Sequence, residues 1–247
     1  MNATRNIHGL DIANLTMDET VGAILGMLGE PRLHAIFTPN AEIVMQSVRD
    51  PALARLLNEA DLLLPDGAGV VLGAKILGTP LKEKVSGIDT ARRLMSEKRR
   101  PPLRFFLFGG KPGVAELAAI HLLSEHPGIE IAGFRNGYFT EAEEEGIVEE
   151  INRAGTDILF VCLGVPKQER WIEKHRDHLH CRVAMGLGGS LDVFAGTGRL
   201  APEWMRRAGL EWLFRLMREP SRWKRMMDLP RFMLLTLRTR LAGKPER

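Results

Sequence analysis

Residues 60–78 read ADLLLPDGAGVVLGAKILG, and this stretch decides the fold. An apolar run, residues 62–64, stops at Pro65-Asp66-Gly67. Apolar residues then recur at three- and four-residue steps as far as Gly78, which stands where a helix C-cap is expected. The pattern predicts a strand, a tight turn and a helix, with the Asp66 carboxylate at the carboxyl end of the strand. Ligands bind at that end of open parallel sheets, so Asp66 is the first candidate for chemistry.

The same strand–turn–helix plan repeats along the chain. Further strands are expected in five apolar stretches, residues 34–38, 103–110, 129–134, 157–164 and 182–189. Six strands alternating with helices predict an α/β fold, Rossmann-like, with a layered, mostly parallel sheet and helices on both faces. A short strand or hairpin is expected in residues 5–14.

Local signals predict where several helices begin. Asn40 and Thr140 are expected to cap the helices that follow them, because their side-chain oxygens can accept from free backbone amides. Pro112 is expected near the first position of its helix, where a missing N–H costs little, and Pro166 is expected to start a helix. Residues 81–90 are expected to form a basic loop before a helix that begins at residue 91.

Composition indicates a soluble globular protein. The chain has 247 residues, 45% of them hydrophobic and 26% charged. Its two cysteines, Cys162 and Cys181, lie in apolar runs and are expected to be buried thiols in a reducing compartment. No secretory signal is visible, and the late apolar run at residues 232–237 is short of the roughly 20 residues that cross a bilayer. A cytoplasmic protein, or one peripheral on the cytosolic side of a membrane, is expected.

The C-terminal part has a different composition. From Arg199 onward, 13 Lys/Arg against 5 Asp/Glu give +8, whereas the other 198 residues carry 21 against 26, or −5. Three of the four tryptophans also lie there. We therefore expect an α/β catalytic core in residues 1–195 and a basic, aromatic-rich, membrane-associating appendage in residues 196–247. Pro220 and Pro230 are expected to divide the appendage into two or three short helices. Its charge suits lipid headgroups or nucleic acid.

Polar side chains follow two strands that are expected to be neighbours. Thr38 and Asn40 come directly after one strand and Asp66 after the next, so all three are expected around one crevice. A carboxylate there can take a proton from a hydroxyl nucleophile while its polar neighbours orient the substrate. The alternative is that Asp66 is only a helix cap in an Asp-Gly turn.

Two glycine-rich turns are weaker candidates. Gly109 and Gly110 precede a helix in GGKPG, which is neither Gly-x-Gly-x-x-Gly nor a Walker A loop. The choice there is between a phosphate or nucleotide contact and a simple turn, and residues 186–190 are equally ambiguous. The histidines show no metal-binding pattern, and the chain contains no Asp-x-Asp pair. No metal or other cofactor is expected.

Taken together, the motifs resemble those of the WecG/TagA/CpsF glycosyltransferases, the bacterial enzymes of glycosyltransferase family 26. The resemblance runs in order from about residue 8 to residue 230. It is carried by TPNAE (38–42), LPDG (64–67), VSGID (85–89), FLFGGKPG (106–113), GYF (137–139), LGVPKQE (163–169), GLGGSLD (186–192), GLEWLFRL (209–216) and EPSR (219–222).

The resemblance implies an inverting, metal-independent transfer of a sugar from a UDP-sugar to a polyprenyl-diphosphate-linked saccharide. N-acetylmannosamine is the family's best-known donor sugar. The products serve teichoic acid, common antigen or exopolysaccharide synthesis. Such enzymes work peripherally on the inner face of the cell membrane, so a membrane surface is an expected partner.

The resemblance also implies roles for single residues. Asp66 would be the general base, Thr38 and Asn40 would line its pocket, and Gln168 would lie near the substrate. Arg215, Arg222 and Arg225 would reach the diphosphate. Lys84 is also expected to bind substrate. It stands where the family often has arginine, and a lysine keeps the charge but loses the bidentate geometry, which weakens a phosphate role there.

Two other functions are compatible with parts of the sequence. A nicotinamide-dependent oxidoreductase would suit a doubly wound sheet, but the glycine fingerprint is missing. A nucleic-acid-binding protein would suit the basic tail. We expect no nucleic-acid partner, and the apolar residues of the tail favour self-association.

Overall fold

The computed structural model describes residues 3–243, without the side chain of Arg222. The chain forms two compact units, each built from segments that are separated in the sequence. Unit 1 comprises Met1–Met17, Thr38–Ser86 and Leu200–Arg247, and unit 2 comprises Asp18–Phe37 and Gly87–Arg199.

Unit 2 is built around a parallel sheet. Its strands are β3 (His34–Phe37), β5 (Arg104–Gly109), β6 (Glu130–Arg135), β7 (Ile158–Cys162) and β8 (Val183–Gly186), in the order β3-β8-β7-β5-β6. All pairings between them are parallel. Strands β7 and β8 are buried along their whole length, which is why they read as uninterrupted apolar runs. A sixth short strand, β4 (Leu62–Leu63), belongs to unit 1. The predicted layered α/β fold is therefore confirmed.

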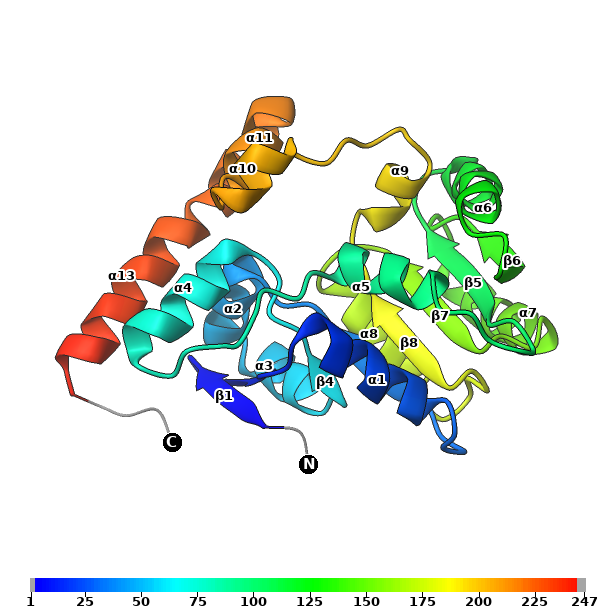
Figure 1. Cartoon of the computed structure of the whole chain (residues 1–247), viewed down its shortest axis with the longest axis horizontal. Helices are drawn as coiled ribbons and strands as arrows, with labels where there is room; N and C mark the ends of the chain where they lie inside the picture. The colour runs from blue at the N-terminus through cyan, green and yellow to red at the C-terminus, as the bar shows by residue number, and fades with distance from the viewer. Residues whose placement is uncertain (1–2, 244–247) are drawn as a thin grey trace. The chain divides into compact units, whose positions relative to one another are not determined.

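Helices flank this sheet (Figure 1). They are α1 (Met17–Met27), α5 (Gly87–Met95), α6 (Val114–Glu125), α7 (Glu144–Arg153), α8 (Lys167–Lys174) and α9 (Ser190–Phe194), with a 3-10 turn η1 (Glu141–Glu143) before α7. Helix α6 packs on β5 and β6, and α8 packs on β3, β7 and β8. Thr140 caps η1 in a capping box with Glu143, as its position predicted.

Two predicted helix starts in unit 2 are wrong. Helix α5 begins at Gly87, so only the first part of residues 81–90 is a loop. Ser86 and Asp89 form the Ser-x-x-Asp pattern that is typical of a helix start, and this local signal favours a start near Gly87 over residue 91. Helix α6 begins at Val114 behind Gly113, and Pro112 lies in the turn before it.

Unit 1 begins with the predicted hairpin. Strands β1 (Thr4–Ile7) and β2 (Leu10–Ala13) are antiparallel, and their turn residues His8 and Gly9 both have positive φ, as a tight hairpin turn requires. Three helices follow, α2 (Ala41–Arg49), α3 (Pro51–Asn58) and α4 (Ala68–Leu77). Asn40 caps α2 as predicted, because its Oδ1 accepts from Ile43 N at 3.0 Å.

The C-terminal segment of unit 1 is helical. It contains α10 (Glu203–Arg207), α11 (Glu211–Arg218), a 3-10 turn η2 (Pro220–Arg222), α12 (Trp223–Met226) and α13 (Asp228–Leu241). Two or three short helices were predicted, so the number is wrong, and Pro230 does not end a helix. Pro230 lies in the first turn of α13, where its backbone N–H would have no helical partner in any case.

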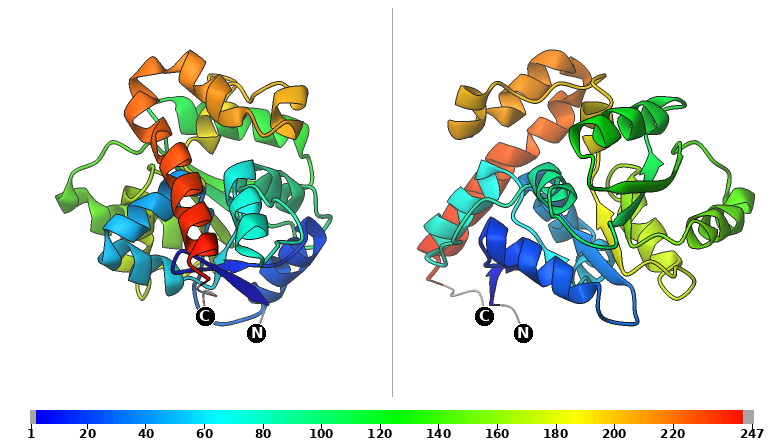
Figure 2. Two further views of the ribbon diagram at one scale, coloured as in Figure 1. Left: turned by 90° about the vertical axis from the view of Figure 1, so that its left-hand side faces the viewer. Right: turned by 45° about the vertical axis from the view of Figure 1, so that its right-hand side comes forward.

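Helix α13 is packed onto the rest of unit 1. It runs along α2 and α4, and the views in Figure 2 show it beside α4. Phe232 is fully buried against Gly73 of α4, where an added Cβ would lie 2.5 Å from the ring. Arg49 of α2 donates two hydrogen bonds, of 2.8 and 2.7 Å, to the buried Asp228 carboxylate, and this pairing lowers the pKa of Asp228. The end of the C-terminal segment is thus part of the hydrophobic core of unit 1.

Candidate active site

Asp66 lies in a turn that is held against the segment following β3. Its backbone N donates to Pro39 O at 3.2 Å, and a Cβ on Gly67 would lie 3.8 Å from Asn40 Cβ. The segments that contain Thr38, Asn40 and Asp66 are therefore side by side, as the strand-end argument predicted. Helix α4 takes Gly67 as its N-cap, with φ 88°, so Asp66 is not the N-cap of this helix. The alternative that Asp66 serves only as the cap of this helix is therefore not supported.

The C-terminal segment meets this turn within unit 1. Gly209, between α10 and α11, faces the start of α4, and a Cβ there would lie 2.8 Å from Ala68 Cβ. Lys84 Nζ lies 2.7 Å from Glu211 Oε1 at the start of α11. Helix α11, which carries Arg215, therefore begins close to the turn that contains Asp66.

Two of the three arginines predicted to bind the diphosphate, Arg215 and Arg225, lie on described elements of the C-terminal segment. Arg215 is exposed on α11, one turn beyond Glu211. Arg225 Nε lies 3.7 Å from Glu42 Oε1, two residues after Asn40. The third predicted arginine, Arg222, has a side chain outside the described part of the structure.

Gly109 and Gly110 lie in unit 2, at the end of β5. Both have positive φ, 137° and 71°. A Cβ on Gly109 would lie 2.2 Å from Cys162 O, so close packing against β7 already requires a glycine there. Gly110 N donates to Cys162 O at 3.2 Å, and its own carbonyl accepts from Gly137 N at 2.9 Å. Packing against β7 thus explains why position 109 is a glycine, whereas Gly110 lines a pocket.

Gly109→Ala is expected to destabilise unit 2. The added methyl group would overlap a backbone carbonyl that cannot move aside, in a backbone conformation that alanine rarely adopts. We expect the free energy of unfolding to fall by about 1–3 kcal/mol. Thermal and urea unfolding measure this, with Gly113→Ala as control, because Gly113 has φ 84° but an open space around its Cβ position. Equal losses in the two variants would mean that backbone strain, not contact with β7, decides the effect.

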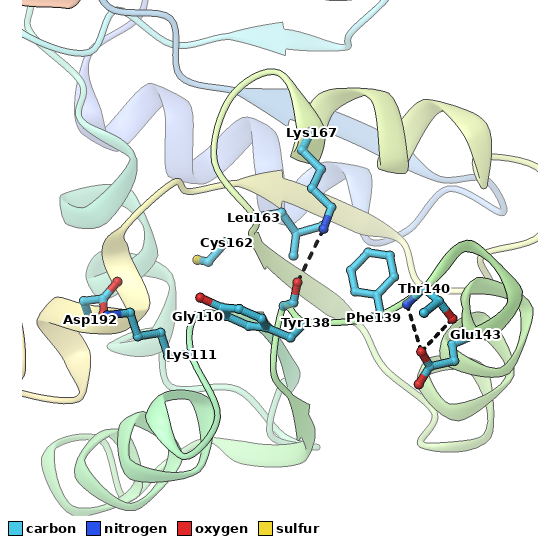
Figure 3. Close-up of a pocket in the computed structure, with 11 residues that line it drawn as sticks. Gly110, Lys111, Tyr138, Phe139, Thr140, Glu143, Cys162, Leu163, Lys167 and Asp192 are labelled. Carbon is cyan, nitrogen blue, oxygen red and sulfur yellow. Dashed lines mark hydrogen bonds between the residues drawn. The ribbon is translucent and has the colours of Figure 1, made fainter. Parts of the chain in front are cut away.

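A pocket of about 670 Å³ opens beside Gly110. In Figure 3, Lys111 and Asp192 lie on one side of it, Phe139 and Lys167 on the other, and Tyr138 between them. Tyr138 is 66% exposed. Lys167 Nζ lies 4.1 Å from the centre of the Phe139 ring and 3.4 Å from Gly137 O. These residues follow the ends of β5, β6, β7 and β8, and none of the five was predicted as a site residue. Two signals were available, namely their position just after predicted strands and their place in the motifs that carry the family resemblance.

Gln168 is buried beside this region, at the start of α8 as predicted. Its Oε1 accepts from Gly188 N at 2.9 Å, and its Nε2 donates to Glu169 Oε1 at 2.8 Å. A Cβ on Gly186 would lie 2.8 Å from Gln168 Nε2. The amide is thus fixed between α8 and the loop after β8. Glu169 is 1% exposed, and this burial raises its pKa to about 7.

The buried Glu169 should make stability fall as pH rises. Its folded pKa of about 7 exceeds the ordinary value of 4.5, so the folded state keeps a proton that the unfolded state releases. The contribution of Glu169 to the free energy of unfolding is then lost between about pH 4.5 and pH 7. We expect Glu169→Gln, which keeps the size and the bond from Gln168, to reduce this loss. Melting temperatures of both proteins between pH 4.5 and pH 8 measure it, and parallel curves would contradict the assignment.

Both cysteines are buried, as predicted. Burial raises the pKa of Cys162 and of Cys181 to about 12, so neither thiol forms a thiolate readily at neutral pH. In the described residues, no three His, Cys, Asp or Glu side chains are grouped so that they could hold a metal ion. None of the helices formed by residues 3–243 is long and apolar enough to span a bilayer.

The model of the glycosyl transferase WecG/TagA/CpsF family matches residues 5–246. The chain belongs to this family. It is 34% identical to a protein of Bacillus subtilis strain 168 over 95% of this chain and 91% of the relative. It is 37% identical to a protein of Bacillus spizizenii, over 85% and 81%, and 34% identical to one of Staphylococcus aureus strain MRSA252, over 92% and 90%. All three are named N-acetylglucosaminyldiphosphoundecaprenol N-acetyl-beta-D-mannosaminyltransferase.

Membership of the WecG/TagA/CpsF family makes the protein a glycosyltransferase. The predicted resemblance is confirmed over nearly the whole chain. The two alternatives, an oxidoreductase and a nucleic-acid-binding protein, are set aside by this match.

Proposed function

We propose that the protein transfers N-acetylmannosamine from a UDP-sugar to a polyprenyl-diphosphate-linked N-acetylglucosamine. The observation that carries this proposal is the 34–37% identity, over most of the chain, to enzymes named for that acceptor and that sugar. Those names specify a β-linked product, which inversion of an α-linked UDP-sugar would give. Such a reaction belongs to the synthesis of a cell-surface polysaccharide.

Asp66 is the proposed general base. Its carboxylate takes the proton of the acceptor hydroxyl as that oxygen attacks the anomeric carbon of the donor. The bond from the anomeric carbon to the diphosphate oxygen breaks, and UDP leaves with the electron pair. Thr38 and Asn40, on the segment beside Asp66, are proposed to hold the acceptor hydroxyl in line.

The pocket beside Gly110 is the proposed nucleotide site. The exposed Tyr138 ring offers a face on which a base can stack. The Asp192 carboxylate can accept hydrogen bonds from ribose hydroxyls, and the ammonium groups of Lys111 and Lys167 can approach phosphate. Gln168 is proposed to position the donor through its fixed amide.

Arg215, Arg222 and Arg225 are proposed to neutralise the diphosphate. The charge that develops on the leaving group needs a cationic partner, and the chain has no Asp-x-Asp pair of the kind that holds a divalent ion in many enzymes using nucleotide sugars. Guanidinium groups bind phosphate with two parallel hydrogen bonds. No metal requirement is proposed.

Residues 203–227 are the proposed membrane contact, on the inner face of the cell membrane. Large apolar side chains are exposed there beside basic ones: Trp204, Trp212, Met217, Trp223 and Met227. Tryptophan and basic residues suit the interface between lipid headgroups and acyl chains. The same surface favours self-association when no membrane is present.

The activity is tested by UDP release from the purified full-length protein in EDTA. A panel of UDP-sugars would be offered with and without a short-chain polyprenyl-diphosphate-N-acetylglucosamine. We expect release with UDP-N-acetylmannosamine only when the acceptor is present. Equal release without acceptor, or with another sugar alone, would contradict the proposed specificity.

The membrane contact is tested by vesicle sedimentation. We expect the variant Trp204→Ser/Met217→Ser/Trp223→Ser to bind vesicles of phosphatidylglycerol and phosphatidylcholine about tenfold or more weakly, because buried apolar area sets the affinity. Ile120→Ser on α6 removes an apolar side chain of similar exposure, 59%, from unit 2 and is expected to change nothing. Unchanged binding by the triple variant would exclude this surface.

A further inference from the structure

The ion pair between Lys84 and Glu211 joins two parts of unit 1 that are far apart in the sequence. Nζ and Oε1 lie 2.7 Å apart, and each side chain is only 26% exposed. The pair is therefore partly shielded from water. An ionic interaction in such a place is stronger than one on an open surface.

The backbone around Lys84 is fixed on both sides. Val85 N donates to Pro65 O at 3.0 Å, directly beside Asp66. Lys82 N donates to Asn14 Oδ1 at 2.8 Å. The Lys84 ammonium therefore projects from a stable support next to the candidate base.

Helix α11, in contrast, has little packing of its own. It buries none of its residues fully, and its main neighbours are α10, η2 and α12 of the same segment. Two described contacts tie its start to the Asp66 region, namely Glu211 with Lys84 and Gly209 with Ala68. Arg215 is four residues after Glu211 and so lies on the same side of the helix, one turn further along.

We propose that Lys84 and Glu211 are a positioning pair that holds α11 at the Asp66 turn and thereby places Arg215 for the diphosphate. This inference rests on the proposed function, and it gives Lys84 a different role from the substrate contact expected from the sequence. The Lys84 ammonium is paired with the Glu211 carboxylate, which offsets its charge toward an anion, so the proposal has Lys84 act through α11 and not as a phosphate ligand. A phosphate-binding arginine at this place would instead bind the diphosphate directly, so the two roles make different predictions.

The test compares the single variants Lys84→Glu and Glu211→Lys with the double variant that carries both. Each single change places like charges opposite each other. We expect faster hydrogen exchange in residues 211–218 and a kcat lowered about tenfold or more, with the KM for the UDP-sugar within about twofold. The double variant restores an opposite pair with the order of charges reversed. It should regain the slow exchange of α11 and most of kcat.

A phosphate-binding Lys84 would give the opposite pattern. The double variant would then be as inactive as Lys84→Glu, because a carboxylate at position 84 repels a diphosphate, and Glu211→Gln would be fully active. Either result would overturn the proposal. Glu149→Lys is the matched control: it makes the same charge change on α7 of unit 2, where Glu149 pairs with the exposed Arg153, and it should leave exchange in residues 211–218 and kcat unchanged.

The exchange measurement separates this proposal from the proposed reaction. If the wild-type protein releases no UDP with any sugar, the proposed function fails, but exchange in α11 still reports whether the pair holds the helix. Unchanged exchange in both single variants would overturn the positioning role even in a fully active enzyme.

Discussion

Asp66→Asn is expected to lower kcat for sugar transfer by about 10²–10⁴-fold, which is the usual contribution of a general base. Asparagine keeps the size and polarity of the side chain, but it cannot take the proton of the acceptor hydroxyl. The turn should survive, because it is held by backbone bonds, with Asp66 N donating to Pro39 O and Val85 N to Pro65 O. UDP affinity should change less than twofold, since the proposed nucleotide pocket is lined by residues of unit 2.

Turnover from UDP release and UDP affinity from calorimetry check this expectation together. Asp61→Asn, which removes an acid just before β4, serves as the control and should retain activity. Near wild-type turnover in Asp66→Asn would show that Asp66 only shapes the turn. A loss of UDP binding in that variant would show that the turn supports the donor site as well as the proton transfer.

The sequence predicted those features whose causes are local or follow from a general packing rule. Strands β7 and β8 read as continuous apolar runs because both of their faces are buried. Asn40 was recognised as a cap because the interaction spans only three residues. The approach of Asp66 to Asn40 followed from the rule that the carboxyl ends of parallel strands meet at one edge of a sheet.

The features that were missed depend on contacts between distant segments, or on position within a helix. The predicted break at Pro230 is wrong because a proline is tolerated in the first turn of a helix, and the sequence alone does not show where α13 begins. The pocket collects Lys111 and Tyr138 from two loops and Asp192 from α9, and no single short motif joins them. Lys84 and Glu211 are 127 positions apart, so their pairing needed the fold. For Gly109 the sequence leaves a phosphate contact and a simple turn open, and only the fold shows that Cys162 O leaves no room for a side chain there.

Phe232→Ala is expected to be the most destabilising single change in the C-terminal segment. The side chain is fully buried, and its ring fills the space that Gly73 leaves open on α4. The edge of the ring also meets the His8 ring, with centroids 5.5 Å apart, and His8 Nε2 lies 2.9 Å from Thr236 Oγ1 on the next turn of α13. Truncation leaves a cavity among groups that backbone packing holds in place. A loss of about 3–5 kcal/mol in the free energy of unfolding is expected.

Urea unfolding followed by circular dichroism measures this loss, and hydrogen exchange in α4 and α13 shows where it occurs. Leu234→Ala is the matched control, because it shortens a side chain on the same helix that is 50% exposed, and it should cost less than about 0.5 kcal/mol. Equal losses in the two variants would contradict the docking of α13 on α4. If Phe232→Ala frees α13 while the exchange of residues 211–218 stays slow, then the Lys84–Glu211 pair and the Gly209–Ala68 contact suffice to hold α11. If exchange rises in both helices, α13 is the anchor on which the positioning of Arg215 depends.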